Sequence, residues 1–157
     1  GMAGLIAAGV VGVLHLITRR PALASWTRGL LISGWAFWVA HFVVSMPATR
    51  LTWGPWIAWG EPRVTMTLQL AAAGLVVLIV TWLLGDARFT AFAAALLAVA
   101  VLWMAASTGV LRHPLDPIGS SPSATFQLVY LALLVPVIAS MALVAWRLSA
   151  EAPHEAR

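Results

Sequence analysis

Five long apolar runs constrain this chain more than any other feature of its sequence. Backbone polar groups in lipid must be bonded internally, and a helix needs about 20 residues to cross the hydrocarbon. The runs cover residues 2–17, 29–47, 64–84, 89–110 and 124–146. Hydrophobic residues make up 62% of the chain and charged residues only 9%, against about 25% charged in soluble domains. We therefore expect an all-α, polytopic transmembrane bundle of about five helices over residues 1–150, followed by a polar tail, 151–157.

The arginines predict how this bundle is oriented, because cytoplasmic flanks carry an excess of positive charge. With the N-terminus outside, the inner segments hold Arg19, Arg20, Arg28, Arg88, Arg147 and Arg157, and the outer segments hold Arg50, Arg63 and Arg112. This distribution favours an N-out, C-in topology with a cytoplasmic tail. The same arginines are scattered instead of forming a stripe, so we expect no nucleic-acid partner.

The stretch "LTWGPWIAWGEPRV", residues 51–64, carries three tryptophans at intervals of three. This spacing would place Trp53, Trp56 and Trp59 on one side of a short interfacial helix. Such a face could lie on the lipid surface, where tryptophan commonly gathers. It could also form a flat wall for a large planar ligand, with Arg63 pairing a carboxylate. Single tryptophans at other helix ends are assigned to the interfacial belt: Trp26, Trp82, Trp103 and Trp146.

Two histidines are candidate metal ligands. His41 lies in the second apolar run, about 9 Å below its outer end, on one helix face with Trp38 and Ser45. A polar ring in lipid is expected to find a partner inside the bundle, either functional or a helix-to-helix hydrogen bond. His113 lies in the outer loop "LRHPLDPIGSSPS", where Pro114 restricts its backbone. Two imidazoles beside an aromatic wall suit haem iron. His15 and His154 are interpreted as incidental.

Several other chemistries find no support in the sequence. The chain has no cysteine and only five acidic residues, which argues against thiolate metal sites and a catalytic carboxylate pair. It has no phosphate-binding glycine loop and no H-E-x-x-H motif. The "GSSPS" stretch lacks the strand-turn-helix context of a nucleophile elbow. We therefore expect no catalytic residues.

The segment "WGPWIAWGEPR" resembles the tryptophan-rich signature of the cytochrome c assembly family, which are haem-handling membrane proteins. The matching positions are Trp53, Gly54, Trp56, Trp59 and Arg63, with Glu61 at the acidic position. The later stretch "VLRHPLDPIGSSPSA" resembles the outer loop of the CcmC-type branch, in which a histidine ligates haem. Members usually read W-D-x-R and have six helices, whereas this chain reads W-G-E-P-R and has five apolar runs.

The resemblance, over residues 29–148, implies a protein that binds haem b at the outer face of a prokaryotic inner (plasma) membrane and passes it on for cytochrome c biogenesis. The implied partners are the bilayer, a haem chaperone and ABC-type transporter subunits. The implied site consists of the iron ligand His113, with His41 as a substitute second ligand, and of Trp38, Trp53, Gly54, Trp56, Trp59, Glu61 and Arg63 around the porphyrin. Two alternatives stay open: a non-haem membrane scaffold or transporter subunit with interfacial tryptophan anchors, and a small-solute permeation protein lined by His41 and Gln69.

Overall fold

The computed structural model describes residues 1–109 and 122–150, and this part of the chain contains helices and no strands. The helices are α1 (Met2–Thr18), α2 (Pro21–Trp53), α3 (Pro62–Leu84), α4 (Ala87–Ser107) and α5 (Ala124–Ala150). All except α1 are long and apolar enough to cross a membrane, and α1 is a shorter apolar helix of 17 residues. The predicted helical membrane bundle of about five helices is therefore confirmed. The predicted tail, 151–157, and the end of the fourth apolar run at residue 110 lie outside the described residues.

The second helix is much longer than its apolar run. It has 33 residues and is about 50 Å long at a rise of about 1.5 Å per residue, against about 30 Å of hydrocarbon. Pro21 occupies its first turn, where the missing N–H costs nothing. The connection expected over residues 18–28 is wrong, because only Arg19 and Arg20 separate α1 from α2. Arg19 has a left-handed backbone (φ 57°), and its N–H donates to the carbonyl of His15 at 2.8 Å.

The short gap between the apolar runs 64–84 and 89–110 is a tight turn between α3 and α4. Gly85 ends α3 with φ 62°, and its N–H donates to the carbonyl of Thr81. A left-handed residue at this position favours glycine. Asp86 then begins α4, because its carboxylate accepts the N–H of Phe89 at 2.6 Å. One glycine and one acid therefore reverse the chain between two membrane-spanning helices.

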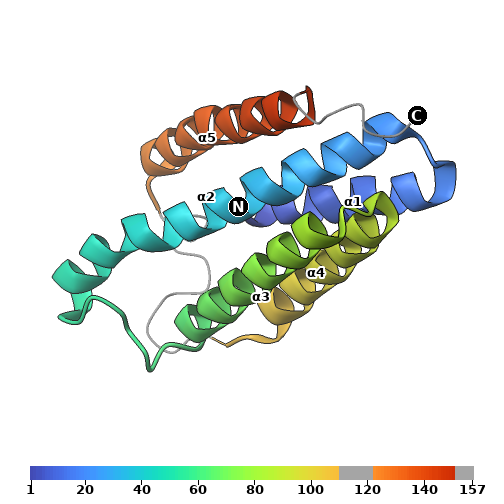
Figure 1. Ribbon diagram of the computed structural model, residues 1–157. Coiled ribbons are helices and arrows are strands. Elements are labelled where there is room, and N and C mark those ends of the chain that lie inside the picture. Colours follow the sequence, from blue (N-terminus) through green and yellow to red (C-terminus); the bar gives the residue numbers. More distant parts are fainter. Residues whose placement is uncertain (110–121, 151–157) are drawn as a thin grey trace.

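The five helices form three layers (Figure 1). The middle layer contains α1 and α2, α3 and α4 pack on one side of it, and α5 packs on α2 from the other side. Only Met141 and Ala145 of the described α5 side chains are buried. Most of α5 therefore presents aliphatic side chains that the protein does not cover, as a lipid-facing helix does.

Small residues let α1 pack closely in the middle of the bundle. A Cβ placed on Gly12 would lie 2.7 Å from the carbonyl oxygen of Ala91 in α4, and one on Gly34 would lie 2.8 Å from the carbonyl carbon of Gly4. Helices in lipid associate through such close backbone approaches, because lipid tails supply no hydrophobic driving force. The buried apolar cluster around these contacts includes Leu5, Leu31, Leu70, Leu97 and Val101.

Two tryptophans of α2 join it to α3 by hydrogen bonds. The indole N–H of Trp35 donates to the carbonyl of Ala71 at 2.8 Å, and that of Trp38 donates to the carbonyl of Thr67 at 3.0 Å. A carbonyl oxygen has two lone pairs, so each can accept an indole N–H in addition to its own helical bond. These pairings fix the antiparallel register of α2 and α3.

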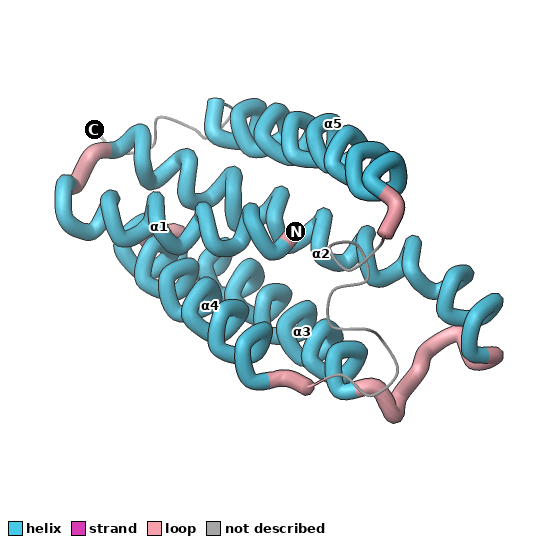
Figure 2. Tube along the Cα trace, turned by 180° about the vertical axis from the view of Figure 1, so that it is seen from behind, coloured by secondary structure: helices cyan, strands magenta, loops and turns pink. Residues whose placement is uncertain are grey.

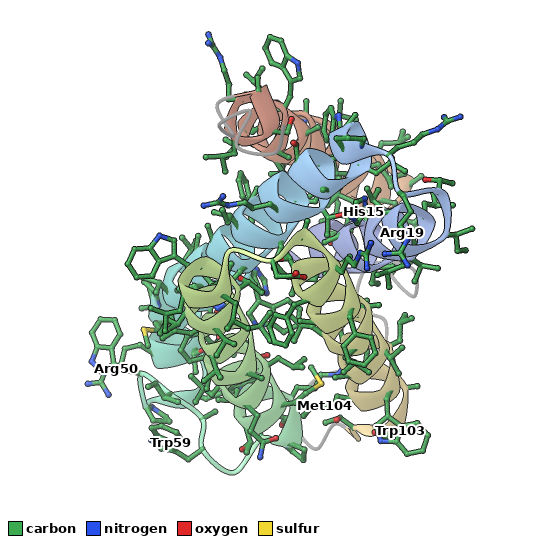
Figure 3. The ribbon with its side chains drawn as sticks, turned by 45° about the vertical axis from the view of Figure 1, so that its right-hand side comes forward. His15, Arg19, Arg50, Trp59, Trp103 and Met104 are labelled. Atoms are coloured by element: carbon green, nitrogen blue, oxygen red, sulfur yellow. The ribbon has the colours of Figure 1, made fainter. Side chains whose placement is uncertain are left out.

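The antiparallel helices place most of the arginines at one end of the bundle. We call this the arginine end. It carries the α1–α2 link with the first part of α2, the start of α4 and the C-terminal part of α5, and its arginines are Arg19, Arg20, Arg28, Arg88 and Arg147. The opposite end, the tryptophan end, carries the α2–α3 connection. Figure 3 shows His15 and Arg19 at the first end, and Arg50, Trp59 and Trp103 toward the second.

Candidate functional site

Residues 54–61, which we call the tryptophan segment, form the longest described connection in the bundle (Figure 2). Gly54 ends α2 with φ 93°, and its N–H donates to the carbonyl of Arg50 at 3.1 Å. The guanidinium of Arg50 donates in turn to the carbonyl of Gly54. Pro55 follows directly, and Pro62 occupies the first turn of α3. The short interfacial helix expected here is wrong, because a left-handed residue followed by proline stops the helix before the second tryptophan.

The three tryptophans consequently have different surroundings. Trp53 is the last residue of α2 and is partly buried, whereas Trp56 and Trp59 lie in the non-helical segment with exposed fractions of 58% and 67%. The segment is held by backbone bonds, since Trp59 donates to Ile57 at 3.1 Å and the next turn closes through Ala58, which is buried. Two large indoles are therefore held on an ordered backbone without being covered by the protein.

Glu61 and Arg63 lie two residues apart, where the tryptophan segment leads into α3, and they face different environments. Glu61 is 1% exposed and precedes α3, and its carbonyl accepts the N–H of Val64 at 3.0 Å. Arg63 is exposed in the first turn of α3 and makes no ion pair with any of the described residues. The cation of the motif is therefore accessible to an anionic ligand, and the acid lies inside the protein.

Trp38 and His41 do not share one environment, although they are one turn apart on α2. Trp38 is buried and its N–H is bonded to α3, whereas His41 is exposed and has no hydrogen-bond partner in residues 1–109 and 122–150. The partner expected for His41 inside the bundle is therefore not found among these described residues. Ser45, on the same face, donates to the carbonyl of Phe42 at 2.7 Å.

The length of α2 changes where His41 lies relative to the tryptophans. The helix continues to Trp53, so His41 lies about 18 Å below its end along the axis. The tryptophan segment then returns toward the bundle. Because Trp38 lies opposite Thr67, His41 and Arg63, each about one turn farther along, lie at similar heights on neighbouring helices. His41 therefore lies at the height of Arg63, where α3 begins, and not at the height of Trp53, where α2 ends.

The remaining candidate ligands are not brought together within the described residues. His113 lies outside them, and no group of three or more His, Cys, Asp or Glu side chains that would hold a metal occurs in the part that the structure describes. Gln69 is exposed on α3. His41 and Gln69, the two residues that the permeation hypothesis assigned to a polar lining, therefore both lie on the surface of the described bundle.

His15 is a residue whose role the sequence reading missed. It is buried at the end of α1, and its Nδ1 lies 3.0 Å from the carbonyl oxygen of Arg20. The acceptor is a carbonyl, so Nδ1 carries the proton in this contact. His15 therefore ties α1 to the start of α2. The sequence feature that could have indicated this role is the position of His15 as a basic residue in the last turn of α1, shortly before "TRRP".

No family model, curated protein or solved structure matches this chain. The resemblance to haem-handling proteins therefore rests on the residues of the tryptophan segment and of the histidine loop alone.

Proposed function

We propose that the protein binds haem at its tryptophan end and passes it to an acceptor outside the cytoplasm. One observation carries this proposal: Trp56 and Trp59 are uncovered on an ordered, non-helical segment, and the nearby cation Arg63 makes no ion pair within residues 1–109 and 122–150. Porphyrins bind to flat aromatic surfaces, and their propionates pair with arginine. This combination supports a platform for a large, planar and anionic ligand.

The described residues fit the porphyrin better than they fit its iron. The two indoles match the apolar macrocycle and Arg63 matches a propionate. Iron ligation would depend on His41, which is exposed on α2, and on His113, which the resemblance nominates. Neutral imidazole is a normal axial ligand of haem iron. The proposal therefore assigns porphyrin binding to the tryptophan segment and assigns the ligand roles to these two histidines.

The resemblance also supplies the setting of the proposal. It suggests a prokaryotic inner membrane, cytochrome c biogenesis as the process, and a haem chaperone with ABC-type transporter subunits as partners. Haem b would be bound and released without a covalent step, so the protein would act in transport and not as an enzyme.

The test is a haem titration of the purified protein in mild detergent, followed by the Soret absorbance. The variant Trp56→Ala/Trp59→Ala should weaken haem binding at least tenfold, because each aromatic contact contributes about 0.5–1.5 kcal/mol beyond its buried area. The matched control is Trp82→Ala/Trp103→Ala, which removes two indoles that are 72% and 73% exposed and lie outside the tryptophan segment. This control should bind haem like the wild type.

Variants of the two histidines test the iron ligands separately. His113→Ala and His41→Ala should each shift the Soret maximum of the bound haem. A wild-type protein without any Soret band, oxidised or reduced, would exclude the haem proposal. An unchanged spectrum in one of the histidine variants would remove that residue from the ligand set and leave the porphyrin platform in place.

A membrane scaffold anchored by tryptophans is the second candidate function. It is favoured by one observation: Trp82 and Trp103 are as exposed as Trp56 and Trp59 and lie at opposite ends of the bundle. Exposed tryptophans at both interfaces are typical of membrane anchoring. For such a scaffold, both double variants would change membrane partitioning to a similar extent, and neither would affect haem.

A further inference from the structure

A groove opens between α2 and α3 at the arginine end, on the far side of the Trp35–Ala71 hydrogen bond from the tryptophan segment. It consists of two adjoining depressions that share Arg28, Thr81 and Trp82. The groove lies at the opposite end of the bundle from the proposed haem platform, so its occupant is a separate question.

The two parts of the groove differ in polarity. The part nearer the α3–α4 turn is lined by Ser25, Arg28, Thr81 and Thr90 together with small residues. The adjoining part is lined by the aliphatic side chains Leu31, Ile32 and Leu78. Along α2, Leu31 and Ile32 lie about one turn farther into the bundle than Arg28. The lining therefore changes from polar to apolar in the direction from the end of the bundle to its middle.

The polar part of the groove favours an anion. Arg28 is exposed and forms no ion pair with the described residues, and the hydroxyl of Ser25 has no hydrogen bond to them. Thr81 and Thr90 donate their hydroxyl protons to their own helices, to Leu78 and Asp86. Asp86 is the one acid in the described part of this end, and its carboxylate caps α4. The other arginines at this end of the bundle outnumber it: Arg19, Arg20, Arg88 and Arg147.

We propose that this groove binds an anionic phospholipid. Arg28 pairs with the phosphate and Ser25 donates a hydrogen bond to it. One acyl chain lies along Leu31, Ile32 and Leu78, and Trp82 packs beside the headgroup at the interface. A basic recess between transmembrane helices that continues into an aliphatic depression has the two chemistries of a lipid in the same order. A free phosphate would leave the aliphatic part without a function.

The test is retention of lipid by the purified protein, measured by native mass spectrometry with phosphatidylglycerol or phosphatidylcholine added. Wild-type protein should retain phosphatidylglycerol preferentially. Arg28→Gln should weaken that retention about tenfold, the usual effect of losing a charged hydrogen bond. Arg88→Gln is the matched control, since it removes the same charge at the same end from a residue that does not line the groove, and it should change retention less than threefold.

Three results would overturn the proposal. Equal losses in the Arg28 and Arg88 variants would mean that the charge of the whole end attracts lipid without a site. Equal retention of phosphatidylcholine by the wild type would mean that the headgroup charge is not recognised. Displacement of phosphatidylglycerol by inorganic phosphate at equal concentration would mean that the groove is a simple anion site. A normal thermal unfolding curve of Arg28→Gln would show that its loss of lipid does not come from misfolding.

Discussion

Replacing Gly34 with alanine tests whether close backbone packing holds α1 against α2. A Cβ on Gly34 would lie 2.8 Å from the carbonyl carbon of Gly4 and 2.8 Å from the amide nitrogen of Leu5. Both obstacles are backbone atoms, which cannot rotate away as the end of a side chain can. Gly34→Ala must therefore push the two helices apart, and the separation weakens the dispersion contacts along their interface.

The size of the effect follows from two opposing contributions. Overpacking a filled interior costs about 1–3 kcal/mol, and a backbone obstacle such as Gly4 places Gly34→Ala near the upper limit. Alanine in a helix interior recovers about 1 kcal/mol relative to glycine. The net loss of unfolding free energy is therefore about 2 kcal/mol. At about 2–4 °C per kcal/mol for a chain of this size, the Tm should fall by about 4–8 °C.

The Tm is measured in detergent by far-ultraviolet circular dichroism. The matched control is Gly60→Ala in the tryptophan segment, where an added Cβ meets nothing within 4 Å; its Tm should stay within about 1 °C of the wild type. If Gly34→Ala unfolded at the wild-type temperature or above it, the reasoning that glycine contacts set the α1–α2 distance would be refuted.

Two further substitutions test single hydrogen bonds. Trp38→Phe removes the indole donor to Thr67 and should cost about 1–2 kcal/mol of unfolding free energy. The control Trp103→Phe changes an exposed ring and should cost less than about 0.5 kcal/mol. Equal losses in the two variants would contradict a stabilising role for the hydrogen bond. Asp86→Ala removes the cap on the Phe89 N–H and should cost about 1 kcal/mol, with Asp86→Asn retaining most of the stability in the same unfolding assay.

The sequence predicted helix boundaries well where a helix begins and ends with its apolar run. The expected runs 64–84 and 124–146 begin within two residues of α3 and α5. The prediction failed for α2, which extends beyond its apolar run on both sides, because a helix can continue into water where hydropathy gives no signal. Pro21 at the first turn was the available clue, since proline is favoured there.

The candidate site was predicted less completely than the fold. The sequence identified Trp56, Trp59 and Arg63 as a group, and the structure places all three on the surface near one another along the chain. It did not indicate that Glu61 is buried or that His41 faces outward. Those properties depend on which neighbouring helix covers each position, and a three-residue spacing read along one segment contains no such information.

The sequence by itself determined that this chain forms a bundle of membrane-spanning helices, because the length of an apolar run and the need to bond every backbone group in lipid are properties of each segment alone. Only the tertiary structure decided which side chains became structural. Trp35 and Trp38 donate hydrogen bonds to α3, and His15 hydrogen-bonds the end of α1 to the start of α2. The physical reason is that glycine and alanine contacts set how closely the helices approach, and that approach selects which polar groups are buried and bonded and which remain available to a ligand.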